Sequence, residues 1–185
     1  MKIIPRFLSL FIFGCADKKP KADNQTLDFG LFSIVTPNSW TKIKAQGTDS
    51  YVGQIAIDNT DTVDFDLGWY SNTLTEPEPQ IIERSMLKNI DVLDTTQFII
   101  VDSRKGIDPD KYKKNNISLD TIDGRRAKII FPRKSGIGTT GIYIDSLWQG
   151  GSDIDRFNLY GDNLKPINEK LFLQALKTLK FHKTK

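Results

Sequence analysis

The sequence predicts an α+β domain in which a helix packs across an antiparallel sheet. Apolar residues recur in short runs with period two, which is typical of strands that bury one face. Turn-forming clusters separate these runs, and one helical pattern of apolar residues occupies residues 166–179. Because no internal repeat and no second linker interrupts the pattern, we expect a single domain over residues 27–185.

The expected strands follow one another along the chain. Residues 29–36 form the first strand, which Pro37 ends. Residues 50–58 and 62–70 flank a turn-forming cluster at residues 59–61 and predict a hairpin. Further strands are expected at residues 97–101, 117–122, 126–132, 142–147 and 156–160. Asp123 and Gly124 predict the turn of a second hairpin, between residues 117–122 and 126–132.

The strand at residues 62–70 has the clearest alternation. Its inward face is expected to hold Val63, Phe65, Leu67 and Trp69, and its outward face Asp64, Asp66, Gly68 and Tyr70. Asp64 and Asp66 then lie roughly 7 Å apart on one face. Such a pair suits a hard cation or glycoside hydrolysis, and a solvated strand face explains it equally well.

Aromatic residues extend this candidate ligand site. Exposed aromatic rings beside carboxylates suit the binding of a sugar or a protein partner. We therefore take Asp64, Asp66, Tyr70 and Tyr143 as possible ligand-binding residues. Packing in the core is the alternative for the aromatic rings.

The last helix is expected to begin at Pro166, where a missing N–H costs nothing. Its core-facing stripe consists of Ile167, Leu171, Phe172, Ala175, Leu176 and Leu179. A short strand is expected to follow at Phe181. Residues 81–93 fit helical spacing but stay ambiguous, and the polar residues 104–116 are expected to form a loop.

The first residues have the order of a secretory signal: two basic residues, an apolar run, a small residue and the one cysteine. Ile12, Phe13, Gly14 and Cys15 resemble the lipobox of bacterial lipoproteins. That resemblance implies that residues 1–14 are a signal peptide cleaved between Gly14 and Cys15, and that Cys15 carries a lipid. An ordinary signal peptide is the alternative, whereas a membrane span needs about 20 apolar residues.

Residues 15–26 are expected to be the lipidated cysteine and a flexible tether, because they are mostly polar. Ala16 follows the cysteine, and resemblance to Gram-negative sorting rules then implies the outer membrane. The expected location is thus the bacterial cell envelope, on its periplasmic face or on the cell surface. The membrane is contacted through the lipid.

The composition limits the possible functions. The chain has 26 basic and 23 acidic residues, and two of the basic ones leave with the signal peptide, so no nucleic-acid partner is expected. His182 is the single histidine and lies near the chain end, which disfavours a histidine-based triad or metal site. We expect no cofactor, no metal and no catalytic residue.

Three features together resemble the PsbP-like superfamily. These are a first strand that ends in Pro37 and Trp40, a run of strands that begins at Asp123 and Gly124, and a C-terminal helix that leads to Phe181. The resemblance implies an α/β/α sandwich around a central antiparallel sheet. Its members are mainly non-enzymatic, so we expect a binding or assembly module for an envelope protein or a glycan. A carbohydrate-active or metal-dependent hydrolase that uses Asp64 and Asp66 is the alternative.

Lipidation of Cys15 is directly testable. Mass spectrometry of the mature N-terminus should find an acylated Cys15, and Cys15→Ala should release the protein from membranes, because two or three acyl chains are needed for stable anchoring. A Cys15→Ala protein that still partitions with membranes would contradict the lipobox interpretation.

Overall fold

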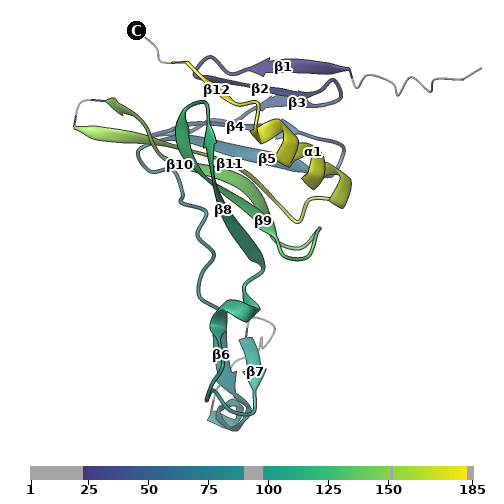
Figure 1. Ribbon diagram of the computed structural model, residues 1–185, viewed down its shortest axis with the longest axis vertical. Helices are drawn as coiled ribbons and strands as arrows, with labels where there is room; N and C mark the ends of the chain where they lie inside the picture. The colour runs from purple at the N-terminus through teal and green to yellow at the C-terminus, as the bar shows by residue number, and fades with distance from the viewer. Residues whose placement is uncertain (1–22, 90–97, 151, 183–185) are drawn as a thin grey trace, which may run out of the picture.

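The computed structural model describes residues 23–89, 98–150 and 152–182, and within them the protein is mostly β (Figure 1). The expected signal peptide and Cys15 lie outside the described residues. A seven-stranded antiparallel sheet has the order β3-β4-β5-β11-β10-β9-β8. Its strands are β3 (Thr41–Lys44), β4 (Tyr51–Ala56), β5 (Thr62–Gly68), β8 (Asn115–Ile122), β9 (Arg125–Pro132), β10 (Thr139–Gly150) and β11 (Asp153–Asp162).

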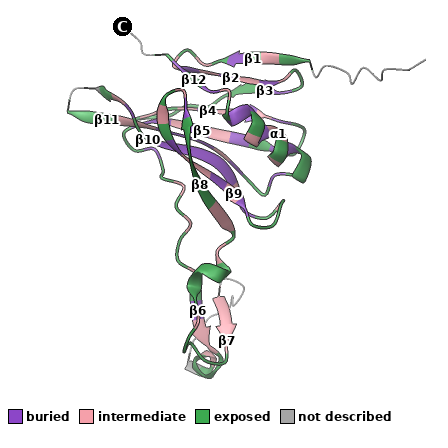
Figure 2. Ribbon diagram, in the orientation of Figure 1, coloured by how far each residue is buried: buried purple, intermediate pink, exposed green. Residues whose placement is uncertain are grey.

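A smaller sheet and one helix lie together against one face of the large sheet (Figure 1). The small sheet has the order β1-β2-β12 and consists of β1 (Asn24–Asp28), β2 (Phe32–Pro37) and β12 (Lys180–Phe181). The helix is α1 (Pro166–Leu176), the only α-helix in the described part of the chain. The main core fills the space between this layer and the large sheet, where most of the purple residues of Figure 2 lie.

Phenylalanine rings join the two sheets. Phe32 of β2 is fully buried, and its ring meets the rings of Phe65 and Phe157 edge-on at 4.9 Å in both cases. Phe181 of β12 packs edge-on against Phe157 at 5.1 Å. Such edge-to-face pairs add about 0.5–1.5 kcal/mol each beyond the area that they bury, so this cluster is a main cohesive element of the domain.

An extension projects from the main body at the lower end of Figure 1. It contains β6 (Gln80–Glu83) and β7 (Phe98–Val101), which form a two-stranded parallel sheet, and the short 3₁₀ helix η1 (Arg84–Asn89). Another 3₁₀ helix, η3 (Pro109–Tyr112), lies between β7 and β8. The expected strand at residues 97–101 is thus present, apart from residue 97, which lies outside the described residues.

Several local predictions are confirmed. The two expected hairpins are β4–β5 and β8–β9, both antiparallel. Asp123 and Gly124 both have positive φ, 50° and 75°, as a two-residue hairpin turn with the right twist requires. The helix begins at Pro166, and β12 is the expected short last strand.

The expected α+β class with an α/β/α sandwich is wrong, because the described part of the chain is mostly β, with one short helix. Among the described residues only one face of the large sheet carries a helix, and α1 shares that face with the small sheet. A second helical layer would have come from the chain between β5 and β8. Pro77 and Pro79 oppose a helix there, and residues 80–83 form a strand. Residues 90–93 of the ambiguous segment lie outside the described residues.

Three finer expectations also differ from the structure. Trp69 is 47% exposed, because the chain leaves the strand geometry at Gly68 and turns. Ile167 is 62% exposed, since the buried stripe of α1 runs through Phe172, Ala175 and Leu176. The strand β1 begins at Asn24, before the expected start of the domain, and the edge strand β3 was not expected at all.

The N-terminus of α1 is fixed by a carboxylate from another element. Asp61, in the β4–β5 turn, accepts hydrogen bonds from the Lys165 N–H and the Asn168 side-chain amide, both at 2.8 Å. Asp58 accepts from the same amide at 2.8 Å and from the Lys165 ammonium at 3.0 Å. A carboxylate at this end of a helix also meets the positive end of the helix dipole, so the turn docks α1 onto the sheet.

Two positions on α1 give a matched test of the packing. Leu176 is 1% exposed and Ile167 is 62% exposed. Leu176→Asp places an unpaired carboxylate in the core and should abolish cooperative thermal unfolding, whereas Ile167→Asp should melt close to wild type. Equal melting temperatures for the two variants would contradict the orientation of α1.

Asp58 should link the docking of α1 to pH. Hydrogen bonds from the Asp61 and Thr60 N–H groups, then from Asn168 and Lys165, lower its pKa well below 3.8. A lowered pKa contributes stability that is present above the unfolded value and is lost as the pH falls below it. We expect Asp58→Asn to be less stable than wild type at pH 6, with the difference narrowing progressively as the pH falls from about 4 to 2. A difference in denaturation midpoint between the two proteins that stays constant from pH 6 to pH 2 would contradict this role of Asp58.

Candidate functional site

The second face of the large sheet is crossed by an extended segment, residues 71–79, which we call the strap. At its start the Ser71 hydroxyl lies 3.0–3.2 Å from the carbonyl oxygens of Asp66, Gly68 and Arg156. The Asn158 amide on β11 then donates to the Asn72 carbonyl at 2.9 Å. The strap is therefore tied to two neighbouring strands as it leaves β5.

Glu76 fixes the far part of the strap to the beginning of β8. Its carboxylate accepts the N–H groups of Lys114 at 2.7 Å and Asn115 at 3.0 Å. It also accepts the Asn115 side-chain amide at 3.0 Å. Hydrogen bonds to a charged acceptor are roughly twice as strong as neutral ones, so Glu76 is the main anchor of the strap at this end.

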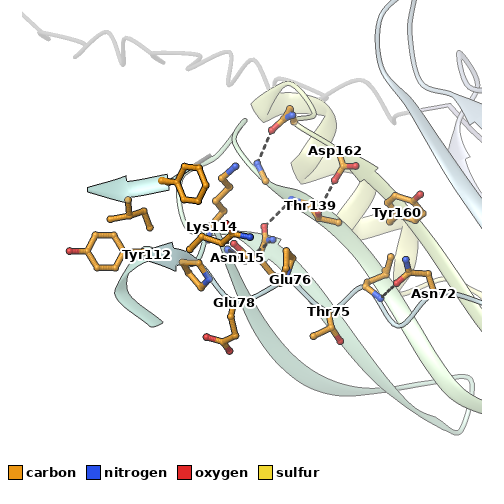
Figure 3. Close-up of a pocket in the computed structure, with 18 residues that line it drawn as sticks. Asn72, Thr75, Glu76, Glu78, Tyr112, Lys114, Asn115, Thr139, Tyr160 and Asp162 are labelled. Carbon is orange, nitrogen blue, oxygen red and sulfur yellow. Dashed lines mark hydrogen bonds between the residues drawn. The ribbon is translucent and has the colours of Figure 1, made fainter. Parts of the chain in front are cut away.

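A groove of about 920 Å³ lies between the strap, the ends of β10 and β11, and the base of the extension (Figure 3). This volume is within the range of small-molecule sites. The strap and β6 supply Asn72, Leu74, Thr75, Glu76, Pro77, Glu78, Pro79 and Gln80 to its lining. The other segments supply Phe98, Ile99, Tyr112, Lys114, Asn115, Gly138, Thr139, Tyr160, Asp162 and Asn163.

One wall of the groove is built by close contacts around Gly138. Asn163 exchanges hydrogen bonds with Gly138, and the Thr139 hydroxyl donates to Asp162 at 2.6 Å. A Cβ on Gly138 would lie 2.3 Å from the side-chain oxygen of Asn115. Its φ of 131° also disfavours any other residue. This wall therefore depends on glycine at position 138.

The chemistry of the lining is polar and aromatic. Side-chain amides of Asn and Gln supply both donors and acceptors, and three rings lie along the groove, those of Phe98, Tyr112 and Tyr160. Among these lining residues Lys114 is the only cation, against three carboxylates. Glu76 already accepts three hydrogen bonds from Lys114 and Asn115, and Glu78 pairs with Lys113 at 3.3 Å. The groove offers little attraction for an anionic ligand.

Tyr160 stays a neutral phenol in this setting. Partial burial raises its pKa above the ordinary 10, and the negative charges of Asp64, Asp162 and Asp66 raise the pKa further. Because the phenol remains protonated at neutral pH, its hydroxyl can act as a hydrogen-bond donor as well as an acceptor.

The predicted pair Asp64 and Asp66 lies on the same face as the strap, at the expected alternate positions of β5. Asp64 is directly opposite Tyr160 and accepts a hydrogen bond from the Gln54 amide at 2.6 Å. Asp66 is opposite Asn158, and one of its carboxylate oxygens is buried without a hydrogen-bond partner among the described residues. Neither carboxylate belongs to the lining of the groove.

The two predicted tyrosines do not join this pair in one site. Tyr143 shares the face, but it is only 9% exposed, and the Lys128 ammonium lies 5.1 Å above its ring. Lys128 in turn donates to the Thr73 carbonyl of the strap. Tyr70 is 66% exposed, beyond the end of β5, and its ring packs on Trp69. The four predicted residues therefore lie outside the groove and do not converge.

The groove residues were missed because the elements that supply them are far apart in sequence. The Pro-rich strap and the Gly-rich segment before β10 were visible only as loops. Tyr160 was expected only as the last residue of a strand, and Asp162 lay outside every expected strand. Alternate polar residues on β11, which continue the face of Asp64, are the one signal that could have drawn attention to them.

Other kinds of site find little support in the described residues. No group of three or more His, Cys, Asp or Glu side chains there is arranged to hold a metal ion. His182 forms its hydrogen bond with Ser33 on the small sheet, at 3.1 Å and in an exposed position. No described helix is long and apolar enough to span a membrane.

Comparison with known proteins gives no independent assignment: no family model matches the chain, and no curated protein sequence is significantly similar to it.

Proposed function

We propose that this chain is a lipid-anchored protein of the bacterial envelope that binds a neutral oligosaccharide in the groove. The signal sequence and the lipobox-like residues support the location. The observation that carries the ligand class is the lining of the groove, which contains amide side chains, aromatic rings and a single lysine. Sugars present many hydroxyl groups and an apolar ring face, which amides and aromatic rings complement.

The rigidity of the groove favours binding over a role as a passive spacer. The strap is held at Ser71 and Asn72 on one side and by Glu76 on the other. A ligand that enters such a preformed groove does not have to order the loop, so less conformational entropy is lost on binding.

Two observations disfavour the alternative of a hydrolase that uses Asp64 and Asp66. The groove lining does not include either carboxylate. Gln54 already occupies one oxygen of Asp64, while one oxygen of Asp66 is buried. Neither carboxylate is therefore exposed to a ligand in the groove as a general acid or nucleophile must be.

Titration calorimetry with the tetramer of N-acetylglucosamine tests the proposal. Tyr112 is 39% exposed and lines the groove, and Tyr70 is 66% exposed and lies outside it. We expect Tyr112→Ala to weaken binding about tenfold, or roughly 1.4 kcal/mol, and Tyr70→Ala to leave it unchanged. Melting temperatures of both variants should match wild type.

Two outcomes would overturn the proposal. One is equal weakening by the two tyrosine variants, which would place the sugar elsewhere. The other is a wild-type protein that does not bind the sugar but does bind a proline-containing peptide, with weaker peptide binding in Tyr112→Ala. That result would identify the groove as a peptide-binding site.

A further inference from the structure

The two edges of the seven-stranded sheet differ in their protection. The strand β3 is four residues long and carries Lys42 and Lys44, a common defence against pairing with another chain. The strand β8 is eight residues long and has Asp120 as its one charge. Its Ile117 and Leu119 are 56% and 62% exposed, and the strand is largely green in Figure 2. An edge of this kind is a template for another strand.

The direction of the free backbone groups on β8 follows from one hydrogen bond. The Arg133 N–H donates to the Lys114 carbonyl at 2.7 Å, in register with the β8–β9 ladder. Antiparallel ladders alternate between bonded and non-bonded pairs. The even-numbered residues of β8 therefore bond to β9, and the odd-numbered residues direct their N–H and C=O groups away from the sheet.

Both ends of this edge are already occupied. Glu76 of the strap accepts the Asn115 N–H at 3.0 Å, and the Asp120 carboxylate accepts the Thr121 N–H at 2.7 Å. Between them, the outward N–H and C=O groups of Ile117 and Leu119 have no partner in the described part of the chain. The open stretch is thus three residues long and centred on Ser118.

We propose that this stretch pairs with the same stretch of a second copy, as an antiparallel two-fold dimer with Ser118 on the axis. Ile117 of each copy then lies opposite Leu119 of the other, and the two pairs exchange four backbone hydrogen bonds. The side chains of these residues lie on one face, so they also form two apolar cross-strand contacts.

The charge of Asp120 and the occupied N–H of Thr121 favour this register over the registers shifted along the strand. With Ser118 on the axis, Asp120 faces Asn116 of the second copy, whose amide can donate to it. An axis at Leu119 would pair Ile117 with Thr121, whose N–H is already taken. An axis at Asp120 would place two carboxylates directly opposite each other. The unpaired groups of Ile117 and Leu119 lie symmetrically about Ser118. A two-fold dimer needs such a self-complementary stretch, so a second copy of this chain is the partner that fits it.

Disulfide trapping tests both the dimer and its register. The full chain carries Cys15→Ser, which leaves an introduced cysteine as the only one. Ser118→Cys should form a covalent dimer under mild oxidation, because non-bonded antiparallel pairs lie about 4.5 Å apart at Cα, within disulfide reach. Asn116→Cys is on the same strand and the same face and keeps Asp120 in place, but it is displaced from the axis and should stay monomeric.

A mixture of the Asn116→Cys and Asp120→Cys proteins should give a mixed dimer, which the Asn116→Cys protein alone should not give. Equal cross-linking of Ser118→Cys and Asn116→Cys would overturn the register. No cross-linking of Ser118→Cys at 100 μM protein would overturn the dimer.

Sedimentation of the full chain without introduced cysteines gives an independent measure. Leu119→Pro removes one outward N–H, which edge strands tolerate, and should weaken dimerisation at least tenfold with the circular dichroism spectrum unchanged. Should the proline disturb the strand, Leu119→Lys gives the same test with the backbone intact. The matched control, Ile43→Lys on the opposite edge, should dimerise as wild type does. A wild-type chain that stays monomeric over the same concentrations would overturn the proposal.

Discussion

The contact of Phe32 with Phe65 and Phe157 is the interaction on which the rest of the architecture depends. It fixes the small sheet against the middle of the large one, and Phe181 of the last strand packs on the same cluster. With this position filled, α1 has only the neighbouring part of the same face to cover, where its Phe172 meets Trp40 at 6.3 Å. One face of the large sheet is thereby committed to the core.

The opposite face is left for polar residues and for the strap. On this face the strap takes the place of a packed layer. It is held against the sheet by hydrogen bonds from Asn158 of β11 and between Glu76 and the start of β8. The groove results from this arrangement, since the strap stands against strand ends rather than filling the space as a helix would. The proposed ligand site is therefore a consequence of the missing second helical layer.

The sequence predicted the local structure better than the way its parts assemble. Two hairpins, the start of α1 and the last strand followed from turn residues, Pro166 and alternation. The arrangement of layers could not be predicted in this way. An apolar strand face indicates that another element packs on it, but it does not indicate whether that element is a sheet or a helix. The residue Ile167 shows the same limit: its spacing fits the stripe, yet the helix is docked with that side outward. At the site, Asp64 and Asp66 were placed on the correct face, while the groove needed pairings between distant segments that no local pattern contains.

The pairing of β2 with β12 has a consequence for the order of events during synthesis. Ser33 and His182, whose side chains meet, are 149 positions apart, and Phe32 pairs directly with Phe181. The strand β2 therefore cannot pair with β12 until residues 180–181 have left the ribosome, and only then can Phe181 pack against Phe157. Such long-range closure slows folding. A domain that cannot complete its fold before β12 has been synthesised remains unfolded for longer, and its apolar strands stay accessible to chaperones during that time.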